Sequence, residues 1–241
     1  MSETASSCKR HRFPPAIIAH AVWLYLRFPL SLRAVQEMLL ERGVEVSHES
    51  LRRWVAKFGP LIARGLRRRQ TYAGRVWHLD EVRVSVQGRR LWLWRAVDEH
   101  GTVLDELLQP RRDRKAPKRL LRRLLKRAGW TPKRIITDKL GSYAAAKREL
   151  APGLEHRRHR GLNNRAENSH LPFQSRERVM RGHRSPGGLQ RFVSMHSAVR
   201  NRFVPSARRR RSAQTIRYHR LEAFDVWRQP SPGRPPSSNP G

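Results

Sequence analysis

The spacing of apolar residues changes at Arg75, and this change constrains the fold more than any other feature of the sequence. Before it, apolar residues recur every three or four positions, as they do on one face of a helix. After it, β-branched and aromatic residues form short runs that are separated by turn residues, as in strands. The sequence therefore predicts an all-α N-terminal domain followed by an α/β domain.

Three helices are predicted before the change, each with a start or stop signal. The first covers residues 15–27. Ser31 is a good N-cap for a second helix that Gly43 ends, and Ser47 caps a third helix that runs to Lys57. Three short helices with a tight turn before the third predict a helix-turn-helix.

The third predicted helix has a basic face opposite an apolar stripe, and the first 73 residues carry 13 Lys and Arg against 5 Asp and Glu. We predict that the polar face enters the major groove of DNA. The residues predicted to contact DNA are Ser47, His48, Ser50, Arg52, Arg53 and Lys57. The alternative is an ordinary helical bundle whose charged face is only solvated.

The elements after Arg75 follow the order of a ribonuclease-H-like core. That core is an α/β fold with a mixed five-stranded sheet and flanking helices, in which the fourth strand lies parallel to and beside the first. The predicted elements are strands at 76–86, 90–97, 102–109 and 134–137, and helices at 115–128, at 142–150, from Asn163 onward, and over Leu189 to Phe203.

Three carboxylates occupy special places in this layout. Asp80 lies on the first strand and Asp138 ends the fourth, so the two are expected side by side, and a helix starting near Asn163 brings Glu167 to the same sheet edge. Glu81 is the rival of Asp80, but neighbouring strand residues point to opposite faces, so only one of them can face the site.

The charge of the chain explains why this carboxylate cluster matters. With 52 Lys and Arg against 19 Asp and Glu, the formal net charge is +33, and nucleic acid is the expected partner. Three carboxylates that face one point repel each other and have raised pKa values unless cations hold them. Two Mg²⁺ ions would provide that charge and predict phosphodiester cleavage or transfer.

Several strings of residues resemble the DDE transposases of bacterial insertion sequences. They are most similar to the small single-protein transposases of insertion-sequence family six, which form cointegrates. The strings are Trp77-His78-Leu79-Asp80-Glu81, Trp94-Arg95-Ala96-Val97-Asp98, Arg111-Arg112-Asp113, Thr137-Asp138-Lys139 with Ser142-Tyr143, and Asn163-Asn164-Arg165-Ala166-Glu167-Asn168-Ser169-His170.

This resemblance implies that Asp80, Asp138 and Glu167 are the catalytic and metal-holding triad, with Mg²⁺ as the cofactor and Mn²⁺ as a substitute. It also implies that the helix-turn-helix binds the terminal inverted repeats, that a freed 3′-hydroxyl is joined to target DNA, and that the chain forms a homo-oligomer, expected to be a dimer. Two alternatives stay open. One is a catalytically inactive relative that only binds double-stranded DNA, and the other is a resolvase or repair nuclease on the same core.

The sequence departs from the family pattern in two places. Asp138 and Glu167 are 29 positions apart (167 minus 138), fewer than in many DDE enzymes. Gln174 stands where a basic residue is common, so Arg176 or Arg178 is predicted to take over that DNA contact. Further predicted contacts to phosphate or DNA are Lys139, Asn164, Arg165, Asn168, His170 and the run Arg208 to Arg211.

Other candidates have simpler interpretations. Asn163 is expected to cap its helix with its side chain, and the alternative is a contact with the scissile phosphate or with water near the metals. His156 and His159 lack the partners of a zinc site, and Trp92 and Trp94 are expected in the core. Cys8 is the only cysteine, so no intrachain disulfide forms.

No stretch of the sequence is apolar enough to be expected to span a membrane. We expect a bacterial cytoplasmic protein associated with the nucleoid. Shifts in composition along the sequence also predict how the chain is divided into segments. The predicted segments are a flexible basic arm (1–12), a helix-turn-helix DNA-binding domain (13–73), a ribonuclease-H-like DDE catalytic domain (74–205), a basic helical segment (206–228) and a disordered tail (229–241).

Overall fold

The computed structural model describes residues 11–69, 74–113, 115–138, 141–180, 182–205 and 212–228. Four predictions fall wholly or largely outside these residues: the basic arm at 1–12, Lys139, the run Arg208 to Arg211, and the tail at 229–241. No helix in the described part of the chain is both long and apolar enough to cross a membrane.

The N-terminal region is helical, as predicted, and its helices are α2 (Pro15–Arg27), α3 (Leu32–Leu40) and α4 (His48–Arg68). Both predicted serine caps are present. The Ser31 hydroxyl accepts a hydrogen bond from the Ala34 amide at 3.0 Å, and the Ser47 hydroxyl accepts one from the Ser50 amide at 3.2 Å. Each bond satisfies an amide that the first turn of a helix leaves without a partner.

Helix α4 is longer than predicted, because it continues past Lys57 to Arg68 with Pro60 inside it. The predicted end at Lys57 was therefore wrong. Burial explains the continuation: the apolar stripe extends beyond Pro60 to Ala63 and Leu66, which are buried. Such tertiary packing offsets the backbone hydrogen bond that an internal proline removes.

The strands form one sheet in the order β3-β2-β1-β4-β5. Strands β1, β2 and β3 are antiparallel neighbours, whereas β4 and β5 run parallel to β1. This is the predicted ribonuclease-H-like layout. The strands are β1 (Val76–Val86), β2 (Arg89–Asp98), β3 (Val103–Gln109), β4 (Arg134–Thr137) and β5 (Glu155–Arg158).

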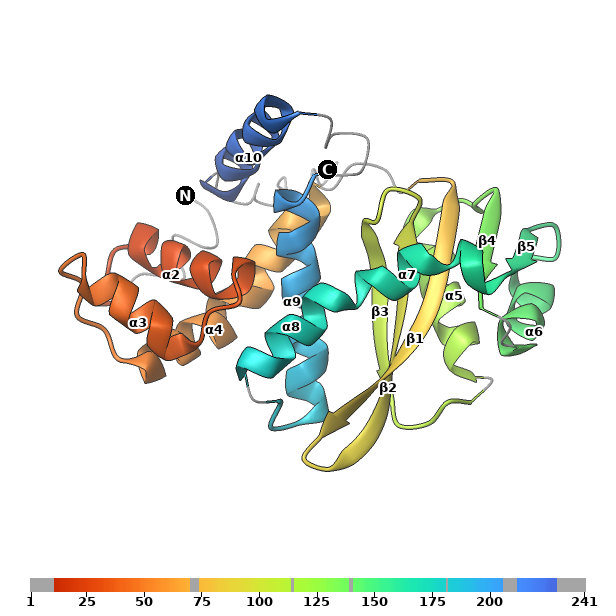
Figure 1. Ribbon diagram of the computed structural model, residues 1–241, viewed down its shortest axis with the longest axis horizontal. Coiled ribbons are helices and arrows are strands. Elements are labelled where there is room, and N and C mark those ends of the chain that lie inside the picture. Colours follow the sequence, from red (N-terminus) through yellow and green to blue (C-terminus); the bar gives the residue numbers. More distant parts are fainter. Residues whose placement is uncertain are drawn as a thin grey trace, which may run out of the picture.

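Helices cover both faces of the sheet (Figure 1). On one face, Trp77 and Leu79 of β1 pack with residues of α5 and α6; on the other, Val84 and Val86 pack with residues of α4 and α9. This division follows the alternation of side chains along a strand. The helices after β3 are α5 (Lys115–Ala128), α6 (Gly141–Leu150), α7 (Asn164–Ser169), α8 (Leu171–Met180), α9 (Pro186–Phe203) and α10 (Ala213–Arg228), with a short 3-10 turn at Arg160–Leu162.

Helix α9 connects the N-terminal helices to the sheet. It packs against α2 and α4 on one side and against β3 on the other. Gly59 of α4 marks a close approach, because a Cβ atom there would lie 2.5 Å from the Met195 sulfur on α9. One apolar cluster consequently runs from α2 through α9 to Leu93 of β2.

Candidate active site

The sheet places Asp80 and Asp138 at neighbouring positions. Leu79 of β1 pairs with Thr137 of β4 in a parallel register. Asp80 directly follows Leu79, and Asp138 directly follows Thr137, so the two aspartates are neighbours. The exposed fraction of the side chain is 14% for Asp80 and 29% for Asp138. Both carboxylates are therefore partly withdrawn from water at the same edge of the sheet.

Glu167 reaches this edge because α7 crosses over β1 and β2 (Figure 1). Asn163, immediately before α7, is completely buried, and its side-chain amide donates a hydrogen bond to the Leu79 carbonyl at 3.0 Å. Its side chain makes no capping bond, so the predicted N-cap role was wrong. The side chain instead ties the start of α7 to β1, one residue before Asp80.

The electrostatics of Asp80 agree with a carboxylate cluster. Burial, followed by the nearby charge of Glu81 and those of Asp138 and Glu167, raises the pKa of Asp80 to about 7. A backbone hydrogen bond from Glu81 lowers the pKa, but by less than burial and these charges raise it. Asp80 is therefore a carboxylate with too little counter-charge around it.

His170 lies directly behind Asp80. Its Nε2 atom is 3.6 Å from the Asp80 Oδ2 atom, and the residue is only 2% exposed. Burial, together with the charge of Arg95, holds the pKa of His170 well below its ordinary value. The imidazole is thus neutral and adds no positive charge to Asp80. Its predicted contact with DNA stays a prediction, for a side chain that the structure places inside the protein.

Glu81 points to the opposite face from Asp80, as the alternation along β1 requires. Its side chain is 2% exposed and accepts a hydrogen bond from the Arg112 Nε atom at 2.8 Å. The Tyr143 hydroxyl, on α6, lies 3.5 Å from its second oxygen. Arg112 also lies over the Trp92 ring and 4.0 Å from the Asp138 carboxylate. Arg112 therefore brings a guanidinium close to both Glu81 and Asp138, and its role was not predicted.

A buried ion pair between Arg95 on β2 and Glu106 on β3 lies next to the site. Arg95 stands opposite Asp80 in the β1–β2 pairing, is 2% exposed, and donates from Nε to Glu106 at 2.9 Å. It also donates to the Ser169 carbonyl at the end of α7. Arg95 thus connects the sheet to the helix that carries Glu167, a role that no sequence pattern indicated.

The candidate metal ligands fit Mg²⁺ by chemistry, because carboxylate oxygens are the ligands that this ion prefers. A divalent cation would also supply the counter-charge that Asp80 lacks. Within the described ranges, no three His, Cys, Asp or Glu side chains form a group that could hold a metal ion in this conformation. His156 bonds the Thr137 hydroxyl at 2.9 Å.

Comparisons with known proteins agree with this geometry. Residues 74–204, more than half of the chain, match a family described as a DDE domain. A transposase for the insertion sequence-like element IS431mec from Staphylococcus aureus (strain N315) is 32% identical over 171 residues, which cover 69% of this chain and 76% of the relative. This chain belongs to the DDE transposases of insertion-sequence family six.

Further relatives of this transposase give the range of similarity. A transposase for insertion sequence element IS257 in transposon Tn4003, also from Staphylococcus aureus, is 31% identical with the same coverage. The uncharacterized protein pYV0051 of Yersinia pseudotuberculosis is 37% identical over 78 residues, 32% of this chain and 73% of that protein. Among solved structures, a simian T-cell lymphotropic virus intasome in complex with PP2A regulatory subunit B56 gamma has 15% identity and a TM-score of 0.41, covering 56% of this chain and 50% of that one.

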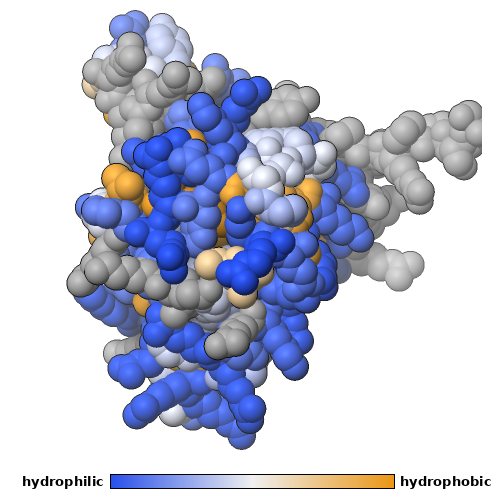
Figure 2. Space-filling model, turned by 90° about the vertical axis from the view of Figure 1, so that its right-hand side faces the viewer, coloured by the Kyte–Doolittle hydropathy of each residue, from blue (hydrophilic) through white to orange (hydrophobic). Residues whose placement is uncertain are grey.

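The predicted DNA contacts of the transposase differ in accessibility. Most of them are exposed, and these are Ser47, His48, Arg52, Arg53, Lys57, Asn164, Arg165, Asn168 and Arg178, whereas Ser50 is half-buried. Arg176 is 2% exposed, and its Nη1 atom donates to the Leu30 carbonyl at 2.8 Å. Of the two arginines predicted to replace the basic residue absent at Gln174, only Arg178 is on the surface. Figure 2 shows that hydrophilic residues cover most of the face at the β5 and α6 end.

The raised pKa of Asp80 predicts how the stability of the metal-free transposase changes with pH. Between the ordinary value of 3.8 and about 7, the folded state holds a proton that the unfolded chain has released, so the free energy of unfolding falls as pH rises through this window. We expect Asp80→Asn to remove most of this fall and to stabilise the metal-free protein above pH 7 by on the order of 1–3 kcal/mol. Urea unfolding in EDTA on both sides of the window measures the effect. An equally steep pH dependence in the variant would show that other groups cause it.

Proposed function

We propose that this transposase binds the terminal inverted repeats of its insertion sequence, cleaves one strand at each end and transfers the freed 3′-hydroxyl to target DNA. The observation that carries the proposal is the convergence of Asp80, Asp138 and Glu167 on one sheet edge in a chain of this family. Asp80 lies on β1, Asp138 directly follows β4, and Glu167 lies on α7, so the three are far apart in sequence. The charges of Asp138 and Glu167 both raise the pKa of Asp80, so the three carboxylates are near one another.

Each part of the site has a defined task in this proposal. Asp80 and Asp138 would hold Mg²⁺, or Mn²⁺ in its place, and Glu167 would complete the ligand set. The bound ion would supply the positive charge that activates an attacking oxygen and stabilises a leaving oxygen at phosphorus. Arg112, 4.0 Å from Asp138, balances the charge of that carboxylate before the metal binds. Asn163 and Arg95 keep α7 over the sheet, so that Glu167 stays near the aspartates.

The helix-turn-helix is the proposed reader of the terminal repeats. The N-terminal half of α4 presents exposed polar and basic residues, while its apolar residues are buried against α2 and α3. Arg52 is paired with Glu49 one turn earlier, whereas Arg53 is exposed and forms no hydrogen bond or ion pair with another described residue. Arg53 is therefore the better placed of the two to contact DNA.

We expect Arg53→Gln to weaken binding to a terminal-repeat duplex by about 10-fold, since a good contact to a base or phosphate contributes on the order of 1–3 kcal/mol. Fluorescence anisotropy with repeat and scrambled duplexes measures the change. Arg83→Gln is the matched control, because Arg83 is an exposed arginine on β1 and its replacement removes the same charge. Equal losses in the two variants would mean that Arg53 contributes only to the overall charge.

The same proposal covers partners and location. The partners are double-stranded DNA, both as terminal repeats and as target, and a second copy of the chain in a homodimer. The place of action is the bacterial cytoplasm in association with the nucleoid. The net charge of +33 supports the binding of both kinds of DNA, the terminal repeats and the target.

Two observations favour a second candidate, a catalytically inactive relative that binds DNA. The described side chains offer no ready metal-binding group of three, and the interval between Asp138 and Glu167 is short. Incubation of supercoiled plasmid carrying both terminal repeats with Mg²⁺ or with EDTA distinguishes the two. An active transposase gives nicked or joined products only with the metal, whereas the inactive relative shifts the plasmid on a gel and leaves it uncut in both.

A further inference from the structure

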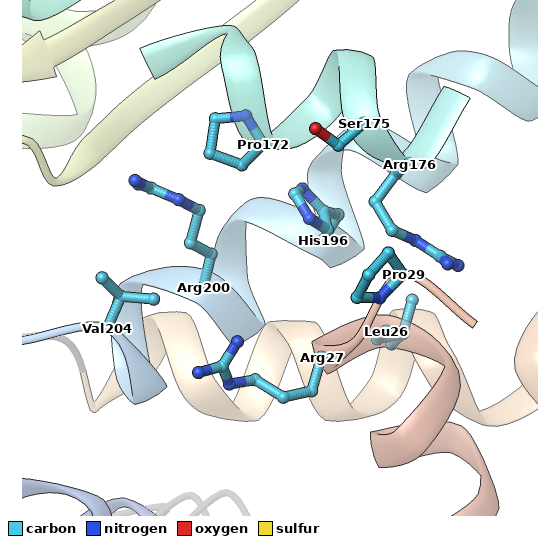
Figure 3. A pocket seen from close by; sticks show the side chains of 9 residues that line it. All are labelled: Leu26, Arg27, Pro29, Pro172, Ser175, Arg176, His196, Arg200 and Val204. Atoms are coloured by element: carbon cyan, nitrogen blue, oxygen red, sulfur yellow. The ribbon is translucent and has the colours of Figure 1, made fainter. Parts of the chain in front are cut away.

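A pocket of about 290 Å³ lies between α2, α8 and α9, apart from the carboxylate site. Its polar lining comes from Arg27 on α2, Ser175 and Arg176 on α8, and His196 and Arg200 on α9. In Figure 3, His196 lies in the middle of the lining, with Arg27 and Arg200 on one side of it and Arg176 on the other. Leucine, proline and valine side chains complete the walls.

The pocket concentrates positive charge. Three of its nine lining residues are arginines, and none is acidic. Burial, followed by the charge of Arg95 and of the three lining arginines, lowers the pKa of His196 to about 3. The imidazole is therefore neutral and available as a hydrogen-bond donor. Burial also lowers the pKa of Arg27 and of Arg176.

One buried nitrogen beside the pocket has no hydrogen-bond partner. Arg176 is already engaged, because its Nη1 atom donates to the Leu30 carbonyl and its guanidinium lies over the Tyr25 ring, 4.7 Å from the ring centroid. The Nδ1 atom of His196, a residue 6% exposed, is buried and has no hydrogen-bond partner among the described residues. A buried donor without an acceptor costs about 1–3 kcal/mol, so an occupant with several acceptor oxygens would be favoured here.

We propose that this pocket binds a phosphate group, held by the guanidinium groups of Arg27 and Arg200 and by the neutral ring of His196, with Arg176 adding positive charge from the other side of the ring. Guanidinium groups match phosphate oxygens in geometry and form charge-assisted hydrogen bonds with them. The volume also leaves space for the sugar next to the phosphate. Two sources have this chemistry: the backbone of bound DNA and free inorganic phosphate.

The position of the pocket favours the DNA backbone as the source. Helix α2 belongs to the N-terminal helices, and α8 continues directly from α7, which carries Glu167. Figure 1 shows α8 between the N-terminal helices and the sheet. A duplex that reaches from the proposed recognition helix to the carboxylates would cross this region. This step rests on the proposed function, whereas binding of inorganic phosphate does not.

The first test uses the full-length transposase and millimolar inorganic phosphate, followed by thermal unfolding against chloride at equal ionic strength. We expect phosphate to raise the Tm of the wild type and of the control variant Arg83→Gln/Arg191→Gln, whose residues are exposed elsewhere. The double variant Arg27→Gln/Arg200→Gln should lose this rise. The control removes the same charge and accounts for the general stabilising effect of phosphate on proteins.

The second test measures how binding to a non-specific duplex depends on salt in the same three proteins. Loss of one phosphate contact should reduce the slope of log K against log salt by about 0.9 in Arg27→Gln/Arg200→Gln, relative to the control. A response in both tests assigns the pocket to a backbone phosphate, and a response to inorganic phosphate alone assigns it to the free ion. A wild type whose Tm phosphate does not raise above that of chloride, with equal salt slopes in all variants, would overturn the proposal. Because neither test requires cleavage, an inactive protein would still give a clear result.

Discussion

Replacement of Asp80 by Asn, of Asp138 by Asn or of Glu167 by Gln is expected to abolish strand transfer while leaving binding to the terminal repeats intact. Each change removes one carboxylate from a set that acts as a unit, and loss of one member of such a set commonly lowers the rate by about 10⁴-fold or more. Binding is preserved because the proposed recognition helix α4 lies on a different part of the molecule (Figure 1).

Joining of a pre-cleaved repeat oligonucleotide to plasmid measures strand transfer, and gel shift with the same oligonucleotide measures binding. Asp225→Asn is the matched control, since Asp225 is an exposed acid on α10, far along the chain from the site. The control should join DNA at the wild-type rate. Any triad variant that keeps its joining activity loses its assignment as a metal ligand. Glu167 is the first to test, because the segment that leads to it is short.

The second large effect is expected in the folded core. Glu106→Gln leaves the Arg95 guanidinium buried without its anionic partner, because Arg95 and Glu106 are 2% and 5% exposed. We expect the free energy of unfolding to fall by about 3–5 kcal/mol, the usual result of breaking one side of a buried ion pair. Urea unfolding followed by circular dichroism measures the loss.

The double variant Arg95→Met/Glu106→Gln separates an unpaired charge from a general packing defect. Removing both charges should recover a large part of the stability, because the cost comes chiefly from the charge left without a partner. A single variant that loses less than about 1 kcal/mol would contradict the burial of the pair. The recovered variant should still join DNA poorly, since Arg95 also holds the Ser169 carbonyl at the end of α7.

Much of the fold could be predicted from local patterns. The bounds of α5 and β4 agree with the predictions, because an apolar helix face and a short buried strand both have strong periodic signals. Strand β5 was not placed individually: its residues, Glu155–Arg158, are all polar, and no alternation marks an edge strand of that kind. The extension of α4 past Pro60 depends on packing against α9, which the local sequence does not contain.

The candidate site was predictable to a similar extent. The aspartates and Glu167 follow from their places at the ends of strands and the start of a helix. Arg112 and Arg95 act through partners 31 and 11 positions away, Glu81 and Glu106, so no short pattern indicates their roles. Arg176 and His170 were predicted at the DNA surface from their sequence neighbours. Their burial depends on which sides of α7 and α8 face the core.

One measurement tests the central claim most directly. A pre-cleaved terminal-repeat oligonucleotide and a supercoiled target plasmid are incubated with the transposase, in Mg²⁺ or in EDTA. The amount of covalently joined product is then measured on a gel. The account predicts joining that requires Mg²⁺, that is absent in Asp80→Asn, Asp138→Asn and Glu167→Gln, and that persists in Asp225→Asn. Joining in EDTA, or in all three triad variants, would contradict a metal-dependent carboxylate site at this edge of the sheet.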